Sequence, residues 1–143
     1  MADWADIELF ADGDLTALEA GLLSKIEGIN KHAEVRDYLK ARITEWFSDL
    51  QKKWESSNDD TSVLIVDELT DDDVENLRLT SVYYNLYLVF YGLQVDTEDL
   101  YARKAAEYKR RYEHEFKFAM SRMRFNTDIT DLDTNIKDVK LLR

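Results

Sequence analysis

The chain lacks cysteine and proline altogether, and its 143 residues include only four glycines and two histidines. Without cysteine it can form no disulfide framework, no thiolate zinc site and no cysteine nucleophile. The glycines are too dispersed to build a phosphate-binding loop, since they stand at positions 13, 21, 28 and 92. His32 and His114 are too far apart to form a helical zinc motif. These absences exclude most enzyme classes that short motifs identify.

The remaining candidate motifs are weak. No Gly-x-Ser-x-Gly nucleophile elbow is present. The segment 131–135 resembles the start of a calcium loop, but Ile136 replaces the turn glycine and Leu142 replaces the bidentate glutamate. The acidic run 70–73 is typical of a helix start rather than of a metal site. We therefore expect no catalytic, cofactor-binding or metal-binding residues, and no enzyme activity.

Charge is divided unevenly along the chain, whose formal net charge is −11. Residues 1–100 carry 23 acids and 8 bases, whereas residues 101–124 carry 8 bases and 3 acids. This division suits contact between copies of the chain, with Arg103, Arg110 and Arg111 facing an acidic surface of a neighbouring subunit. The alternative, which is the more common use of charge runs, is that each charged set is only a solvated helix face. The acidic excess argues against coating DNA or an anionic membrane.

The apolar periodicity predicts an all-α protein, a bundle of about four helices forming a single domain over 1–143. Residues 1–13 form an acidic lead-in, with Trp4, Ile7, Leu9 and Phe10 as docking points. Thr16 and Glu19 fit a capping box for a helix that ends near Gly28. Asn30 can cap the next helix, whose apolar positions run at helical spacing from Val35 to Trp54.

A polar loop at 56–60 precedes the β-branched run 61–67, which we interpret as a short strand or extended segment. Such a strand needs a partner elsewhere in the chain or in a neighbour. Thr70 caps a helix at about 72–93, and its segment 82–93 is apolar nearly all round. That run of about 12 residues is too short to cross a bilayer, so we expect a buried central helix and no membrane contact.

The most regular pattern predicts a last helix over 98–124, capped by Asp96 or Thr97. Its apolar stripe comprises Tyr101, Ala105, Tyr108, Tyr112, Phe116, Ala119 and Met123. A short turn joins it to the preceding helix, which favours an antiparallel hairpin. Its tyrosines lie on this stripe and not among its bases, which favours a structural role over nucleic-acid binding.

The C-terminal segment 129–143 loses the helical period, and we interpret it as an extended arm. It keeps six large aliphatic residues: Ile129, Leu132, Ile136, Val139, Leu141 and Leu142. A solvated tail has little reason to hold so many, which favours docking to a partner in extended form. Folding back onto its own bundle is the alternative.

One stretch resembles a known family. Lys104-Ala105, Tyr108, Arg111-Tyr112-Glu113, Ala119 and Asn126-Thr127-Asp128 follow the pattern of the C-terminal helical hairpin of head-to-tail adaptor (connector) proteins of tailed bacteriophages. The resemblance covers about residues 80–128. The Asp-rich segment that follows the hairpin often carries glycines in that family, and here it has none.

The resemblance implies a structural virion protein that forms a twelve-fold ring at the head–tail neck and is assembled in the host cytoplasm. Its partners would be other copies of itself, the portal protein and a downstream tail or neck protein. Genomic DNA would pass through the lined exit channel without sequence-specific binding. The alternative that composition leaves open is an acidic regulatory or DNA-mimicking protein that occupies a basic site on a partner.

Overall fold

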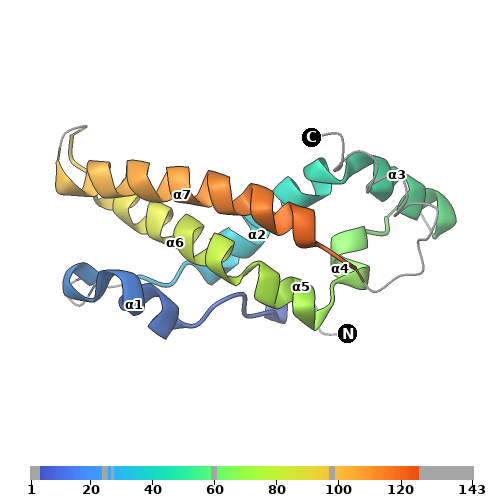
Figure 1. Cartoon of the computed structure of the whole chain (residues 1–143), viewed down its shortest axis with the longest axis horizontal. Coiled ribbons are helices and arrows are strands. Elements are labelled where there is room, and N and C mark those ends of the chain that lie inside the picture. The colour runs from blue at the N-terminus through green and yellow to red at the C-terminus, as the bar shows by residue number, and fades with distance from the viewer. Residues whose placement is uncertain (1–3, 24–25, 27, 59–60, 97–98, 126–143) are drawn as a thin grey trace.

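The computed structural model describes residues 4–23, 26, 28–58, 61–96 and 99–125, and this part of the chain is all-α (Figure 1). It contains no strand. The elements are η1 (Trp4–Asp6), α1 (Asp12–Leu23), α2 (His32–Trp46), α3 (Ser48–Ser57), α4 (Leu64–Glu68), α5 (Asp71–Asn76), α6 (Arg78–Leu93) and α7 (Leu100–Arg122). The all-α prediction is confirmed, although short breaks divide the expected long helices.

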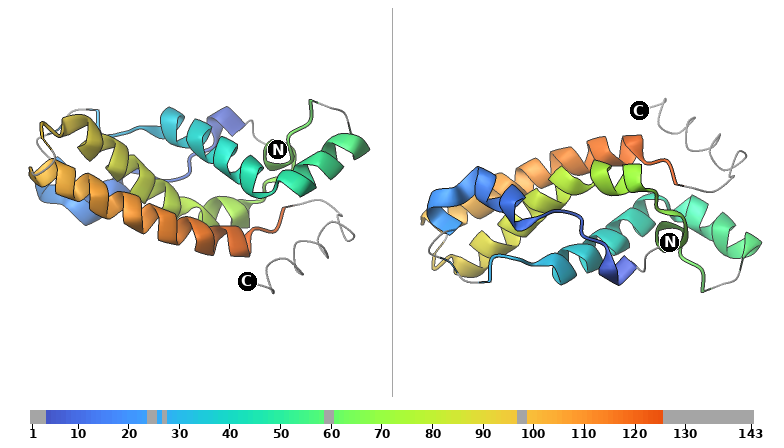
Figure 2. Two further views of the ribbon diagram at one scale, coloured as in Figure 1. Left: turned by 90° about the horizontal axis from the view of Figure 1, so that it is seen from above. Right: turned by 90° about the horizontal axis from the view of Figure 1, so that it is seen from below.

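The long antiparallel hairpin of α6 and α7 forms the body of the molecule (Figures 1 and 2). The predicted stripe of α7 faces inward, and its members from Ala105 to Ala119 are buried. The cap lies later than expected, because the side chain of Asp99 accepts hydrogen bonds from the amides of Ala102 (2.7 Å) and Val95 (2.7 Å). The Asp99 carboxylate thus caps α7 and also fixes the turn between the two helices.

The expected helix at 72–93 is two helices that meet at Leu77. The predicted cap at Thr70 is confirmed, because Thr70 and Asp73 form a reciprocal capping box. Asp73 is also 1% exposed, and its carboxylate accepts hydrogen bonds from the amides of Arg124 (2.8 Å) and Phe125 (2.9 Å). One buried carboxylate therefore sets both the start of α5 and the path of the chain beyond α7.

The expected helix between Asn30 and Trp54 is likewise divided, into α2 and α3, at Phe47. Phe47 leaves helical geometry (φ −103°, ψ 37°), and its buried ring packs edge-on against Phe125 with centroids 5.4 Å apart. The helical period of the sequence continues through this break, because both helices bury their apolar residues in the same core.

The strand expected at 61–67 is wrong, since Leu64–Glu68 forms the short helix α4; Val63, which precedes it, is extended. Gln51 on α3 supplies the polar contacts that a strand partner would have made. Its side chain donates to the carbonyl of Ser62 (2.6 Å) and accepts from the amide of Leu64 (2.9 Å). With those groups satisfied, Leu64 and Ile65 are buried, and tertiary burial overrides β propensity.

The capping box expected at Thr16 is also wrong, because α1 begins at Asp12. Thr16 lies inside the helix, and its hydroxyl donates to the carbonyl of Gly13 (3.3 Å). The docking points of the lead-in are largely confirmed, as Trp4, Leu9 and Phe10 are buried.

The sequence predicts Asn30 as the N-cap residue of α2, but Asn30 lies one residue before the N-cap. Its side chain accepts from the amide of His32 (2.9 Å), while Lys31 is the residue that precedes α2. The buried amide of Asn85 on α6 holds this entry, accepting from the amide of Lys31 (2.7 Å) and donating to the carbonyl of Ile29 (2.7 Å). A polar residue inside the apolar run 82–93 thus positions α2 against α6.

The expected C-terminal arm, residues 129–143, lies outside the described residues, so its extended form stays a prediction. Within the described residues, none of the helices combines the length and the apolar character needed to span a bilayer.

The burial of Tyr112 yields a stability prediction. Its side chain is 3% exposed between α6 and α2, so we expect Tyr112→Ala to lower the free energy of unfolding by about 3 kcal/mol, as for other large-to-small aromatic truncations. Urea denaturation measures the change. Phe118→Ala is the matched control, because Phe118 lies on the same helix and is 46% exposed. A Tyr112→Ala effect below about 0.5 kcal/mol would contradict the packing of the hairpin.

Candidate interaction surfaces

The helix α7 carries the three arginines proposed for a subunit interface, and all three are exposed. Arg103 and Arg110 lie together beside a shallow hollow of about 330 Å³ that Leu100 also lines. Arg111 is directed elsewhere. Its guanidinium pairs with Glu107 (2.9 Å) and lies over the rings of Tyr108 (5.2 Å) and Tyr83 (5.9 Å). The structure therefore brings two of the three arginines to one outward surface and turns the third toward α6.

An ionic cluster joins α1 to α7. Glu19 interrupts α1 with non-helical backbone angles (φ −138°, ψ 42°), and its carboxylate reaches Lys104 (2.9 Å) and the hydroxyl of Tyr108. The Glu19 side chain is 9% exposed, so this contact is largely shielded from water. Burial and the hydrogen bond to Glu19 raise the pKa of Tyr108. Lys104 is thus engaged within the chain and contributes less to the outward basic face.

Acidic residues gather on the opposite side of the molecule, where η1 and α1 lie across α6 from the outer face of α7 (Figure 1). Asp6, Glu8 and Asp12 are exposed there. Asp14 is partly covered and lies 3.4 Å from the guanidinium of Arg78. The described chain therefore presents surfaces of opposite sign on different sides.

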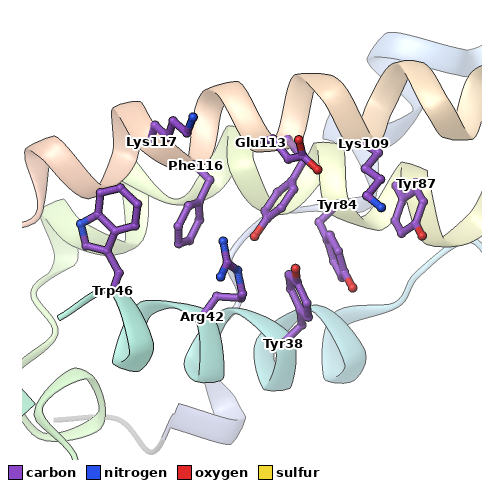
Figure 3. A pocket seen from close by; sticks show the side chains of 10 residues that line it. Tyr38, Arg42, Trp46, Tyr84, Tyr87, Lys109, Glu113, Phe116 and Lys117 are labelled. Carbon is purple, nitrogen blue, oxygen red and sulfur yellow. The ribbon is translucent and has the colours of Figure 1, made fainter. Parts of the chain in front are cut away.

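The third surface is an aromatic groove, defined by ten residues of α2, α6 and α7 (Figure 3). The lining residues are Tyr38, Arg42, Trp46, Tyr84, Tyr87, Lys109, Tyr112, Glu113, Phe116 and Lys117. Its cavity volume is about 410 Å³. Tyr38, Arg42 and Trp46 follow one another at intervals of four on α2, which places them on one side of that helix.

Aromatic contacts build the floor and walls of the aromatic groove. Tyr38 and Tyr84 stack with ring centroids 4.1 Å apart, and Trp46 meets Phe116 edge-on at 5.8 Å. The guanidinium of Arg42 lies over the Phe116 ring at 5.1 Å. These contacts hold Arg42 among aromatic rings that face both α2 and α7.

Two polar atoms in the aromatic groove are buried without a hydrogen bond of standard geometry to any described residue, namely the hydroxyl oxygen of Tyr112 and Nε of Arg42. The two side chains are nonetheless close neighbours. A hydrogen-bonding interaction with the Tyr112 hydroxyl raises the pKa of Arg42, and burial raises the pKa of Tyr112. The Arg42 guanidinium reaches Glu45 through its other nitrogen Nη1 at 3.5 Å. A buried hydroxyl and a buried N–H are therefore left with unused hydrogen-bonding capacity.

The aromatic groove was not expected from the sequence. Tyr38 and Trp46 fall on the apolar period of their helix and therefore read as core, yet both are only half-buried. The sequence did hold one signal of this groove. Arg42 lies four residues from each of the two aromatic residues, so it shares their side of the helix and places a cation beside them.

No group of three or more histidine, aspartate or glutamate side chains that could hold a metal ion occurs in the described residues. The searches of protein-family models, of curated proteins and of solved structures found no match to this chain.

The buried tyrosines predict loss of stability in alkali. Burial raises the pKa of Tyr84 to about 12, and those of Tyr108 and Tyr112 are also raised, against about 10 in an unfolded chain. Groups whose pKa is raised by folding stabilise fully below the unfolded pKa and lose that effect as the pH rises through the folded one. The urea midpoint should therefore fall between pH 10 and pH 12.

Tyr84→Phe separates this effect from the titration of lysines, because it removes one of the phenols and leaves the lysines unchanged. We expect the variant to lose less stability than the unmodified chain between pH 10 and pH 11.5. Equal losses would contradict the contribution of Tyr84.

Proposed function

We propose that this chain is a head-to-tail adaptor of a tailed bacteriophage, a structural protein that forms a ring between the portal and the tail and lines the DNA exit channel. The observation that carries the proposal is the placement of opposite charge on two sides of one molecule, together with the resemblance of residues 80–128 to the adaptor hairpin. A ring of identical subunits needs two different complementary faces on each copy. The outer face of α7 and the η1–α1 side are the two faces that we assign.

Each of these faces has an excess of charge of one sign. Residues 1–23 include six acids and no lysine or arginine, while residues 101–124 have a net charge of +5. Arg103 and Arg110 form no ion pair with another described residue, which leaves them available to a neighbouring subunit. Surfaces of opposite sign fix the orientation in which copies meet.

The shape of the hairpin supports the same use. At 1.5 Å per residue, the 23 residues of α7 span about 35 Å, and α6 covers its inner face over most of that length. A rod of this kind is suited to hold two assemblies at a fixed distance. An acidic channel wall would also let DNA slide past without being gripped.

The acidic η1–α1 side also supports a second candidate, an acidic regulatory or DNA-mimicking protein. This candidate requires a monomer or small dimer that competes with DNA for a basic partner. It gives the exposed arginines of α7 no role, whereas the ring uses both faces. Light scattering on the purified chain, alone and with a candidate portal protein, separates the two functions.

Reversal of charge on α7 tests the ring. We expect Arg103→Glu combined with Arg110→Glu to weaken assembly with a candidate portal, because like charges then face each other across the contact. Salt should weaken the unmodified assembly in the same direction, since exposed pairs are screened. Arg111 is left unchanged, because Glu107, Tyr83 and Tyr108 already surround it.

Lys52→Glu combined with Lys53→Glu is the matched control, since it changes net charge equally on exposed positions of α3. If both double variants assemble like the unmodified chain at low and high salt, the assigned contact is wrong. If both fail equally, net charge alone accounts for the loss.

Deletion of residues 129–143 tests the arm. If the arm docks to the portal or to a neighbour, the shortened chain should keep its thermal midpoint and fail to join the assembly. A midpoint lower by many degrees would instead show that the arm belongs to the core of its own bundle. Calorimetry and sedimentation of the mixture with portal protein measure the two properties.

A further inference from the structure

The side chains that line the aromatic groove are suited to bind an acidic segment. Tyr112 is 3% exposed and lines the groove, and neither its hydroxyl oxygen nor Nε of Arg42 forms a hydrogen bond of standard geometry with another described residue. Both atoms can donate to an oxygen acceptor, and a carboxylate is the acceptor that best satisfies a guanidinium. Lys109 and Lys117 add positive charge to the lining, against the single acid Glu113.

We infer that the aromatic groove binds the segment 126–143 of a second copy of this chain, with an aspartate of that segment placed at Tyr112 and Arg42. The inference rests on the proposed ring and names a contact within it. Residues 126–136 contain three aspartates and no base. The aliphatic residues Ile129, Leu132 and Ile136 alternate with these acids, and they suit a groove whose walls are aromatic and whose lining carries cations.

The position of Phe125 indicates why the segment comes from another copy. The Phe125 ring packs against Phe47, in a small hollow that Ile43 and Thr44 also line. Successive residues of a helix are turned by about 100°, which places Ile43 and Thr44 on a different side of α2 from Tyr38 and Arg42. Phe125, the last described residue, therefore lies on the side of α2 away from the aromatic groove.

The reach of the segment is sufficient for such an exchange. Eighteen residues follow Phe125, and in extended form they span up to about 60 Å. The Asp73 carboxylate holds the amides of Arg124 and Phe125, so the departure point of the segment is fixed in each copy. Every copy thus has one donor segment and one receiving groove, which is the head-to-tail relation of a ring.

Because the chain has no natural cysteine, cross-linking can test the contact directly. One full-length preparation carries Glu113→Cys, which removes the only acid lining the aromatic groove, and the other carries Thr130→Cys between Ile129 and Asp131. After mixing and treatment with a short bismaleimide, we expect a covalent heterodimer as the main product. Ser57→Cys, at an exposed position of α3, replaces Glu113→Cys in the control and should give little product.

Two outcomes overturn the inference. One is a heterodimer yield no greater than that with Ser57→Cys. The other is a link formed only within single chains that carry both Glu113→Cys and Thr130→Cys, which would show that the segment lies in the groove of its own copy.

Tyr112→Phe gives a second readout that a purely structural tyrosine would not produce. The Tyr112 hydroxyl forms no hydrogen bond of standard geometry with a described residue, so its loss should leave the thermal midpoint unchanged or higher. The heterodimer yield at limiting concentration should fall about tenfold, the scale of one hydrogen bond to a charged group. An unchanged yield would remove Tyr112 from the contact and overturn this part of the inference.

A different measurement tests the proposed function separately from the groove contact. Cross-linking with discrete dimers and no larger assembly in light scattering would retain the groove contact and reject the ring. Assembly with portal protein in the absence of any specific cross-link would retain the adaptor function and reject the groove contact.

Discussion

The structure depends on the packing of the aromatic stripe of α7 against α6. Phe90 stacks with Tyr101 and Tyr108 at centroid distances of 6.0 Å, and Tyr84 lies 5.0 Å from Tyr112. Aromatic rings bury large areas at a small cost in rotamer entropy, which suits a pair of long helices joined by a short turn. Because α6 is apolar on several sides, the hairpin also supplies the surfaces on which α1 and α2 pack.

Buried polar side chains then decide where the other segments lie. Asp73 joins the start of α5 to the end of α7, Asn85 joins α6 to the entry of α2, and Glu19 joins α1 to α7. Each satisfies several partners at once, which offsets the free energy of removing a polar group from water. The apolar contacts make the core compact, and these three side chains make its arrangement specific.

The same helix serves two environments. The inner side of α7 contributes Tyr112 and Phe116 to the aromatic groove, while its outer side exposes Arg103 and Arg110. An association of copies through this helix would therefore combine apolar burial with charge recognition. Burial supplies most of the free energy of such contacts, whereas charge determines orientation and the rate of encounter.

The sequence by itself determined the all-α class, the apolar stripe of α7, the capping box at Thr70 and the uneven charge, because periodicity and capping are local properties. Only the tertiary structure decided that the β-branched run at 61–67 becomes helical, because Gln51 from another helix satisfies its backbone. It also decided that Glu19 reaches α7 instead of capping α1, and that Tyr38, Arg42 and Trp46 border a groove. Those outcomes depend on contacts between residues that are far apart in the sequence, and the local spacing of residue types does not determine such contacts.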